Sequence, residues 1–378
     1  MPQKLNSKNN FTFKEWQKIK KFKKKELITF YKKFIKNYLS LNKKYRFNKE
    51  LSKKYIFNQI KEVDKNKNYA LKLLPVGIKD NINTKFLTTD YGLRSKKKFN
   101  VGNNANIVDK IINNGGLIFS KTNCAEYAVH YISDKLNVNP HNNKFIAGTS
   151  STGSAIAVSC GALPVAIGTQ TAGSIIRPAS FCGVYGFKPT YGSIDRTGIL
   201  KNNDLFDTVG IISSEIRFIE SVFKNVLNDS KDFPWNKKYQ LNLNKFKDKK
   251  KLKIGYFDDS LQILNNSTPN IREFYQKILK HLKVNLKLNP IKGDLFNKFH
   301  TYHEILYNKS LSYYSKNYIK NKNSLSKILK EIVMKGEKIS VKEYDDALIK
   351  TISLKKKIKK ITSELDFIVV PSTFSQAP

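Results

Sequence analysis

The chain has 378 residues, of which 40% are hydrophobic and 12% aromatic, so it can bury a large core and lacks the composition of a disordered protein. Its formal net charge of +39 raises the possibility of nucleic acid binding. Lysine greatly outnumbers arginine, however, and is spread over the chain outside the segment 76–200. We therefore interpret the charge as a lysine-biased solvated surface and expect no nucleic acid partner.

The first predicted element is a helix over residues 11–45, where large apolar residues recur every three to five positions among lysines. These residues are Phe13, Trp16, Ile19, Phe22, Leu27, Phe30 and Phe34. A basic amphipathic helix of this kind either lies on a membrane surface or packs its aromatic face on the protein body. We favour packing, because the segment continues directly into globular sequence, and we expect residues 1–59 to form an N-terminal helical arm.

A buried strand is predicted over residues 71–78, and Lys79 follows it directly. A lysine in this place is unusual because burial of an ammonium group is costly, unless the side chain simply reaches the surface. A helix is then predicted from residue 105 to the glycine pair at 115–116, followed by a strand over 117–122. This alternation predicts an α/β fold with a central mixed sheet that helices cover on both faces.

The most distinctive stretch runs over residues 148–192, where glycine and small hydroxyl residues flank an uncharged apolar run. We predict a helix over 154–160, a strand over 161–169 and a tight glycine turn over 170–174. The enclosing segment 76–200 holds 14 of the 18 glycines and only +7 of the net charge of +39. Such a composition is typical of a packed core in which backbone approaches backbone or ligand closely.

The C-terminal half repeats the mixture of helices and strands, without an internal repeat. Its predicted helices cover residues 214–228, 270–283 and 301–365, and its predicted strands cover 251–257 and 365–370.

The sequence also indicates where the protein works. The three cysteines, Cys124, Cys160 and Cys182, form an odd number without paired spacing, which argues against a disulfide framework or a zinc site. The chain has no run of 18 apolar residues, and its first ten residues lack the apolar region of a signal peptide. We therefore expect a cytoplasmic protein without a membrane span.

Several common catalytic motifs are absent: the chain has no G-x-S-x-G elbow, no G-x-G-x-x-G loop, and Ser154 and Ala155 where a P-loop requires lysine and a hydroxyl residue. Serine and lysine remain as reactive groups. A serine hydroxyl becomes a good nucleophile when a base takes its proton, and a lysine can be that base if burial lowers its pKa from about 10.4. Serine–lysine variants of the serine triad are a known solution.

Four blocks, in the same order, resemble the amidase signature family. They are VGIKDNI from Val76, GTSSTGSA from Gly148, GTQTAGS from Gly168 and FCGVYGFKPT from Phe181. The resemblance extends from about residue 60 to the C-terminus and is densest over 76–200. It implies an amidase domain over 60–378 with the amidase-signature fold, and no metal or organic cofactor. Since the family usually continues beyond a motif like PSTFSQAP, we expect the C-terminal part to be shortened.

The resemblance also implies a role for each site residue. Ser174 is the expected acyl-enzyme nucleophile, Ser150 the bridging serine next to a cis peptide bond, and Lys79 the base. The backbone amides of Thr171, Ala172, Gly173 and Ser174 are expected to form the oxyanion hole. Ser151 is expected to support Ser150 and Lys79 through hydrogen bonds. The substrate would be a small amide, cleaved at its C–N bond.

Two departures from the family pattern bear on function. Gln170 stands where the family commonly has aspartate, and Ile176 stands where it often has arginine, with Arg177 one position later. The tRNA-dependent amidotransferase, whose amide-cleaving component belongs to the same family, usually keeps the common pattern there, so these changes favour a stand-alone amidase that hydrolyses linear amides. Two alternatives stay open: a component of such an amidotransferase, releasing ammonia from glutamine, and an inactive, truncated homologue.

Overall fold

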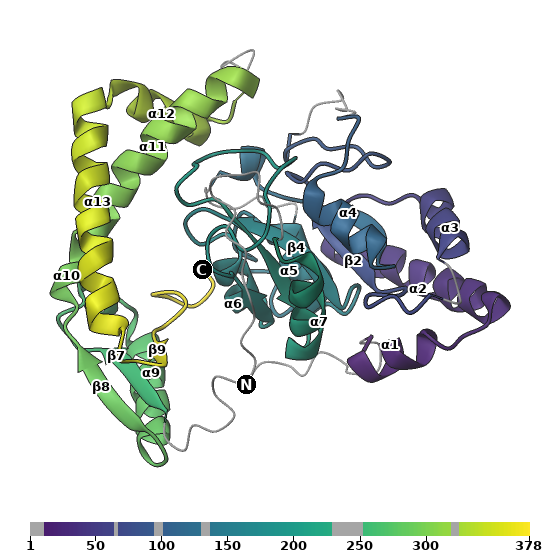
Figure 1. The fold of residues 1–378 in the computed structure, drawn as a ribbon, viewed down its shortest axis with the longest axis horizontal. Coiled ribbons are helices and arrows are strands. Elements are labelled where there is room, and N and C mark those ends of the chain that lie inside the picture. Colours follow the sequence, from purple (N-terminus) through teal and green to yellow (C-terminus); the bar gives the residue numbers. More distant parts are fainter. Residues whose placement is uncertain (1–10, 64–66, 94–100, 130–136, 229–251, 319–324) are drawn as a thin grey trace. The chain divides into compact units, whose positions relative to one another are not determined.

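A computed structural model describes residues 11–63, 67–93, 101–129, 137–228, 252–318 and 325–378 (Figure 1). The chain divides into two compact units. The first comprises Met1–Lys201 and Leu205–Gln240, and the second Asn202–Asp204 and Leu241–Gln376. The division that we expected, an arm over 1–59 and an amidase domain over 60–378, stays a prediction.

The first unit is built on a six-stranded mixed sheet, as predicted. Its order is β1-β3-β2-β4-β6-β5. The three central strands, β3, β2 and β4, are parallel, and β1, β6 and β5 join them in antiparallel pairs. The bounds are β1 Asn48–Glu50, β2 Pro75–Lys79, β3 Leu117–Thr122, β4 Val165–Gln170, β5 Tyr185–Phe187 and β6 Thr208–Ser213.

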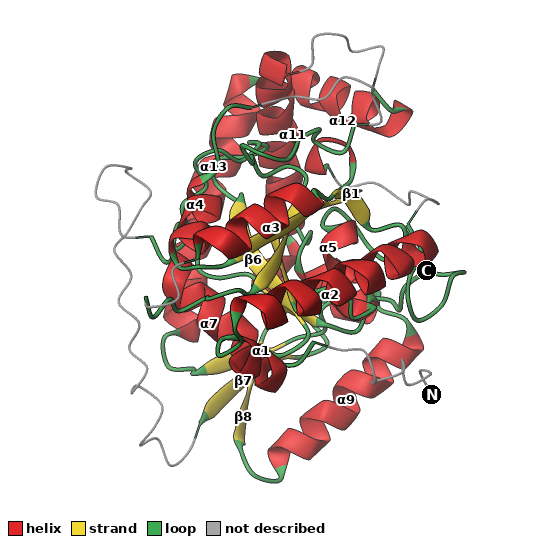
Figure 2. Ribbon diagram, turned by 90° about the vertical axis from the view of Figure 1, so that its right-hand side faces the viewer, coloured by secondary structure: helices red, strands yellow, loops and turns green. Residues whose placement is uncertain are grey.

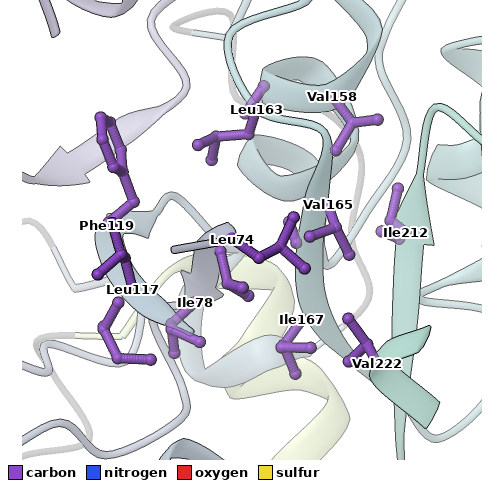
Figure 3. Close-up of a cluster of buried hydrophobic side chains, with 14 of the residues drawn as sticks. Leu74, Ile78, Leu117, Phe119, Val158, Leu163, Val165, Ile167, Ile212 and Val222 are labelled. Atoms are coloured by element: carbon purple, nitrogen blue, oxygen red, sulfur yellow. The ribbon is translucent and has the colours of Figure 1, made fainter. Parts of the chain in front are cut away.

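Helices cover both faces of this sheet. The bounds are α1 Phe13–Ile19, α2 Lys24–Tyr45, α3 Lys53–Glu62, α4 Asn106–Asn113, α5 Thr152–Ser159, α6 Ile176–Phe181 and α7 Ile216–Val226, with a short 3₁₀ turn over Glu126–Ala128. Helix α5 packs across β2, β3, β4 and β6, while α4 and α7 contact each other and the opposite face. In Figure 3, Val222 of α7 lies next to Ile167 of β4, and Val158 of α5 lies on the other side of the strand.

The predicted N-terminal helix is two helices, and the single helix over 11–45 was wrong. The side chain of Thr12 caps α1 in a reciprocal arrangement with Glu15, and Glu26 bonds back to the backbone of Lys23 to start α2. The predicted packing of the aromatic face is confirmed. Trp16 and Tyr31 are fully buried in the main core, and the ring of Trp16 lies 5.9 Å from that of Phe218 on α7.

The strand predicted over 71–78 begins four residues later, at Pro75. Leu71 to Leu74 form a turn, in which Leu73 has a positive φ of 59° and the Leu74 amide donates to the carbonyl of Leu71. The turn residues are still buried, which explains why their apolar run looked like the start of a strand. The strand itself ends at Lys79, where the sequence placed its end.

The second unit has a three-stranded parallel sheet of order β8-β7-β9 and a small core around Phe257, Tyr275 and Ile291. Its strands are β7 Lys253–Phe257, β8 Lys287–Ile291 and β9 Phe367–Val369. Its helices are α8 Gln262–Asn265, α9 Pro269–Lys283, α10 Asp294–Asn297, α11 Phe299–Tyr318, α12 Lys327–Lys338 and α13 Val341–Thr362 (Figure 2).

The helix predicted over 301–365 is three separate helices. Ser326 and Ser340 accept backbone amides at the N-termini of α12 and α13, and such serine caps start a new helix. Gly336 lets α12 cross α11 closely, because a Cβ there would lie 2.0 Å from the carbonyl oxygen of Asn308. None of the helices in the described ranges is long and apolar enough to span a membrane.

Candidate active site

Lys79 is the last residue of β2 and is completely buried. Its ammonium nitrogen lies 2.8 Å from the hydroxyl oxygen of Ser150 and 2.8 Å from that of Thr169, and donates a longer bond of 3.3 Å to the Thr169 carbonyl. Thr169 is near because β4 runs parallel to β2, with Ile78 paired to Ile167. No carboxylate among the described residues lies within 4.0 Å of the Lys79 ammonium.

Ser150 lies just before α5 and follows a cis peptide bond from Thr149, as the resemblance implied. Its side chain is fully buried and its carbonyl accepts the Ala125 amide at 3.1 Å. The backbone here is tightly packed: a Cβ on Gly153, in the first turn of α5, would lie 2.4 Å from the Asn123 nitrogen. This packing holds the serine against the end of β2.

Ser151 makes different contacts from those expected. Its hydroxyl donates to the Thr169 carbonyl at 3.3 Å, and its amide donates to the Ser174 carbonyl at 3.2 Å. Within the described structure it forms no hydrogen bond with Ser150 or Lys79, so the expected direct support is wrong. The side chain faces β4, where a Cβ on Gly168 would lie only 2.9 Å from the Ser151 hydroxyl oxygen.

Ser174 lies in the turn between β4 and α6 and is 5% exposed. The contact between Ser151 and its carbonyl places its backbone beside the Ser150 loop. No hydrogen bond joins the hydroxyls of Ser150 and Ser174, both of which lie in a described range. The structure thus brings Lys79 and Ser150 into contact and leaves the expected second link, from Ser150 to Ser174, open.

The turn before Ser174 presents a row of backbone amides. Of the acceptors in the described residues, none takes a hydrogen bond from the amides of Thr171, Ala172, Gly173 or Ser174. Two side-chain contacts hold the turn: the Thr171 hydroxyl donates to Asp207 at 2.6 Å, and Gln170 accepts the amides of residues 175 and 176. Successive free amides in a turn form a concave anion-binding surface.

Arg177 links this turn to the serine loop. It lies in the first turn of α6, and its guanidinium donates to the carbonyl of Thr149 at 2.9 Å. Its guanidinium carbon would lie 3.7 Å from a Cβ placed on Gly173. A positive charge therefore lies beside the row of amides.

Burial lowers the pKa of Lys79 from 10.5 to about 8, an effect that Cys124 and Asp207 partly oppose. The cause is desolvation, since an apolar surrounding disfavours the ammonium form. A substantial fraction of neutral amine is then present under mildly alkaline conditions. The group has the position and the protonation equilibrium that a base for Ser150 needs.

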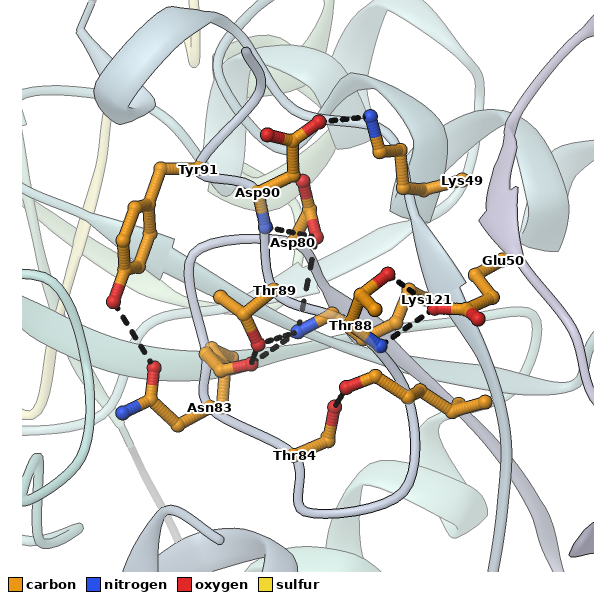
Figure 4. Close-up of polar contacts among 12 residues, drawn as sticks. Lys49, Glu50, Asp80, Asn83, Thr84, Thr88, Thr89, Asp90, Tyr91 and Lys121 are labelled. Carbon is orange, nitrogen blue, oxygen red and sulfur yellow. Dashed lines mark hydrogen bonds and ion pairs between the residues drawn. The ribbon is translucent and has the colours of Figure 1, made fainter. Parts of the chain in front are cut away.

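A second buried lysine was missed by the sequence analysis. Lys121 in β3 lies 3.8 Å from the Asp80 carboxylate and donates to the Thr89 hydroxyl and the Ile82 carbonyl (Figure 4). Burial lowers its pKa to about 8 as well, and Asp80 opposes this shift. The signal was present, because Lys121 interrupts a buried apolar strand as Lys79 ends one.

A cavity of about 340 Å³ adjoins the serine loop. It is lined by residues 137–138, 143–149 and 152, so that it touches Thr149, the neighbour of Ser150. Three or more histidine, cysteine or acidic side chains suited to hold a metal ion occur together nowhere in the described ranges. All three cysteines are free thiols.

Comparisons with known proteins agree with the resemblance. The family model described as Amidase matches residues 30–378. The A-type chain of glutamyl-tRNA(Gln) amidotransferase from Clostridium botulinum (strain Hall) is 30% identical over 369 residues, covering 85% of this chain and 74% of that protein. The chain therefore belongs to the amidase signature family of amide hydrolases.

Solved structures show the same fold. A crystal structure of an amidase has a TM-score of 0.78 at 21% identity, covering 91% of this chain and 79% of that one. An allophanate hydrolase of Kluyveromyces lactis has a TM-score of 0.82 at 19% identity, covering 97% and 61% respectively. The predicted amidase-signature fold is thus confirmed.

Proposed function

We propose that this protein hydrolyses the C–N bond of a linear amide through an acyl-enzyme on Ser174, with Ser150 and Lys79 as the proton relay. One observation carries the proposal: a completely buried lysine with a lowered pKa lies 2.8 Å from the hydroxyl of Ser150. A neutral lysine can accept the Ser150 proton while Ser150 accepts that of Ser174. For this relay the Ser174 hydroxyl has to turn toward Ser150 when substrate binds.

In the first step, the Ser174 oxygen attacks the amide carbonyl carbon as its proton moves to Ser150 and that of Ser150 moves to Lys79. The carbonyl oxygen becomes an oxyanion, and the free amides of Thr171 to Ser174 supply its hydrogen-bond donors. The C–N bond then breaks, and the relay returns the proton to the leaving nitrogen. A water molecule attacks the acyl ester in the same way, which releases the acid and restores Ser174.

We further propose a stand-alone amidase that works on a small molecule in the cytoplasm. The uncharged residues Gln170 and Ile176 support the stand-alone branch, and three free thiols suit a reducing compartment. The second candidate is an amidotransferase component that releases ammonia from glutamine, favoured by the 30% identity with the glutamyl-tRNA(Gln) amidotransferase chain. A catalytically silent homologue is the third candidate.

A panel of amides tests these candidates. The purified protein is incubated with short aliphatic amides, aryl amides and glutamine, and released ammonia or amine is measured beside a Ser174→Ala control. We expect turnover of at least one linear amide other than glutamine, absent in the control. Release of ammonia from glutamine alone would favour the amidotransferase component. No turnover of any amide, together with no labelling by a serine-directed probe, would favour the silent homologue.

A further inference from the structure

Gln170 is the last residue of β4 and lies four residues before Ser174. Its side-chain oxygen accepts the amide of Ile175 at 2.8 Å and that of Ile176 at 3.0 Å. These two amides belong to the residues that start α6, where amide groups have no partner within the helix. One side chain therefore closes the turn that carries Ser174 into a ring.

The second anchor of the turn is Thr171, whose hydroxyl donates to Asp207 at 2.6 Å. Between the two anchors, the amides of Thr171 to Ser174 have no acceptor in the described part of the chain. The side chains thus hold the turn while its amides stay available to a ligand. Loss of the Gln170 oxygen would leave the amides of residues 175 and 176 without their acceptor, so the turn would be free to rearrange.

The charge of the group at position 170 also matters. Gln170 follows Thr169, which bonds Lys79, and it reaches across the turn in which the oxyanion would form. A carboxylate here would accept the same two amides, but it would add a negative charge near both places. The other charged or titratable groups that act on this region are Arg177 beside Gly173, and Asp207 and Cys124, which both raise the pKa of Lys79.

We infer that Gln170 is a positioning residue for the oxyanion turn, which it holds in shape as a neutral acceptor. The inference rests on the proposed function, since the turn matters only if Ser174 is the nucleophile. A neutral amide gives the hydrogen bonds that the start of α6 requires without opposing negative charge on the substrate oxygen. It also leaves the proton affinity of Lys79 unchanged.

Two variants separate hydrogen bonding from charge. Gln170→Met removes the acceptor at similar length, and Gln170→Glu keeps the acceptor and adds a charge. The matched control is Gln59→Met, because the Gln59 amide also holds backbone, accepting the Ile118 amide at 2.8 Å and donating to its carbonyl at 3.0 Å. Gln59 contacts none of the proposed catalytic residues.

The measurement is the rate constant for labelling of the full chain by a fluorophosphonate–rhodamine probe, followed across neutral and alkaline pH. We expect Gln170→Met to label about tenfold more slowly or worse at every pH, with an unchanged midpoint. We expect the midpoint of Gln170→Glu to move to higher pH by about one unit, because a nearby negative charge favours protonated Lys79. The control should lose thermal stability and keep the wild-type rate and midpoint.

Wild-type rates and midpoints in both Gln170 variants would overturn the inference. If Gln170→Met does not fold, Gln170→Glu decides alone, since it keeps both hydrogen bonds and changes only charge. Failure of the proposed function has a different signature: the wild type itself would not be labelled at Ser174. A labelled wild type with unaffected variants contradicts the role of Gln170 alone.

Discussion

The ammonium nitrogen of Lys79 and the hydroxyl oxygen of Ser150 lie 2.8 Å apart, although 71 residues separate them in the chain. The contact forms because β2 ends next to the loop that starts α5, and α5 packs across β2 and β4. Both side chains are completely buried, so bulk water does not compete for their hydrogen bond. A buried amine that directly contacts a serine hydroxyl is the basis of each prediction below.

The pH dependence of turnover should follow Lys79. Its pKa is lowered to about 8, so the fraction of neutral amine, and with it the rate, should rise as the pH passes through about 8. Lysine at its ordinary value would place this rise near 10.5. The measurement is kcat/KM against pH for any amide that is turned over. A flat profile between neutral pH and 9 would show that deprotonation of Lys79 does not limit the reaction.

The two buried lysines provide a matched pair for stability. Lys79 has no carboxylate within 4.0 Å among the described residues, whereas Lys121 lies 3.8 Å from Asp80. Lowering the pKa of Lys79 from 10.5 to about 8 costs about 3 kcal/mol of folding free energy at neutral pH, because one unit corresponds to about 1.4 kcal/mol. This penalty is fully present below pH 8 and disappears as the pH rises from about 8 to 10.5, where the unfolded chain binds more protons.

We therefore expect Lys79→Met to abolish turnover and to leave the free energy of unfolding at pH 7 unchanged, or to raise it by up to about 2 kcal/mol after the lost hydrogen bonds are subtracted. Lys121→Met should lower it by about 3 kcal/mol, because Asp80 would remain as a buried, unpaired carboxylate. Urea unfolding of both variants at pH 7 measures the difference. Equal losses in the two variants would contradict the contrast between the two sites.

The anchor from Thr171 to Asp207 can be tested with two variants. Thr171→Val removes the hydrogen bond of 2.6 Å while keeping the shape of the side chain, and should lower kcat by about tenfold without moving the pH profile. Asp207→Asn keeps an acceptor oxygen but removes a charge that raises the pKa of Lys79, so its profile should move to lower pH. The prediction fails if Asp207→Asn moves the profile upward, or if Thr171→Val has full activity.

Much of the fold could be predicted because local patterns carry it. The apolar run before Lys79 and the alternation of strands and helices over 105–170 each depend on neighbouring residues, and the structure has these elements within a few positions. The helix boundaries inside 11–45 and 301–365 depended on single capping contacts, such as that between Thr12 and Glu15, which a periodic pattern does not reveal.

The contacts around the site were harder to predict, because they join residues that lie far apart in the sequence. Thr169 bonds Lys79 across 90 positions, and Asp207 bonds Thr171 across 36. No spacing rule connects such residues; the order of strands in the sheet does. The same reason explains why the contacts of Ser151 were predicted wrongly, since its neighbours are set by the close approach of Gly168.

The central claim, that Ser174 is the nucleophile which Ser150 and Lys79 activate, is tested most directly by mapping the residue that a fluorophosphonate modifies. The wild type, Ser174→Ala and Lys79→Met are treated with the probe above pH 8, digested and analysed by mass spectrometry. The account predicts a single adduct on Ser174 in the wild type, no adduct at that position in Ser174→Ala, and strongly slowed labelling in Lys79→Met with the fold intact by circular dichroism. An adduct on another serine with Ser174 unmodified, or labelling of Lys79→Met at the wild-type rate, would contradict it.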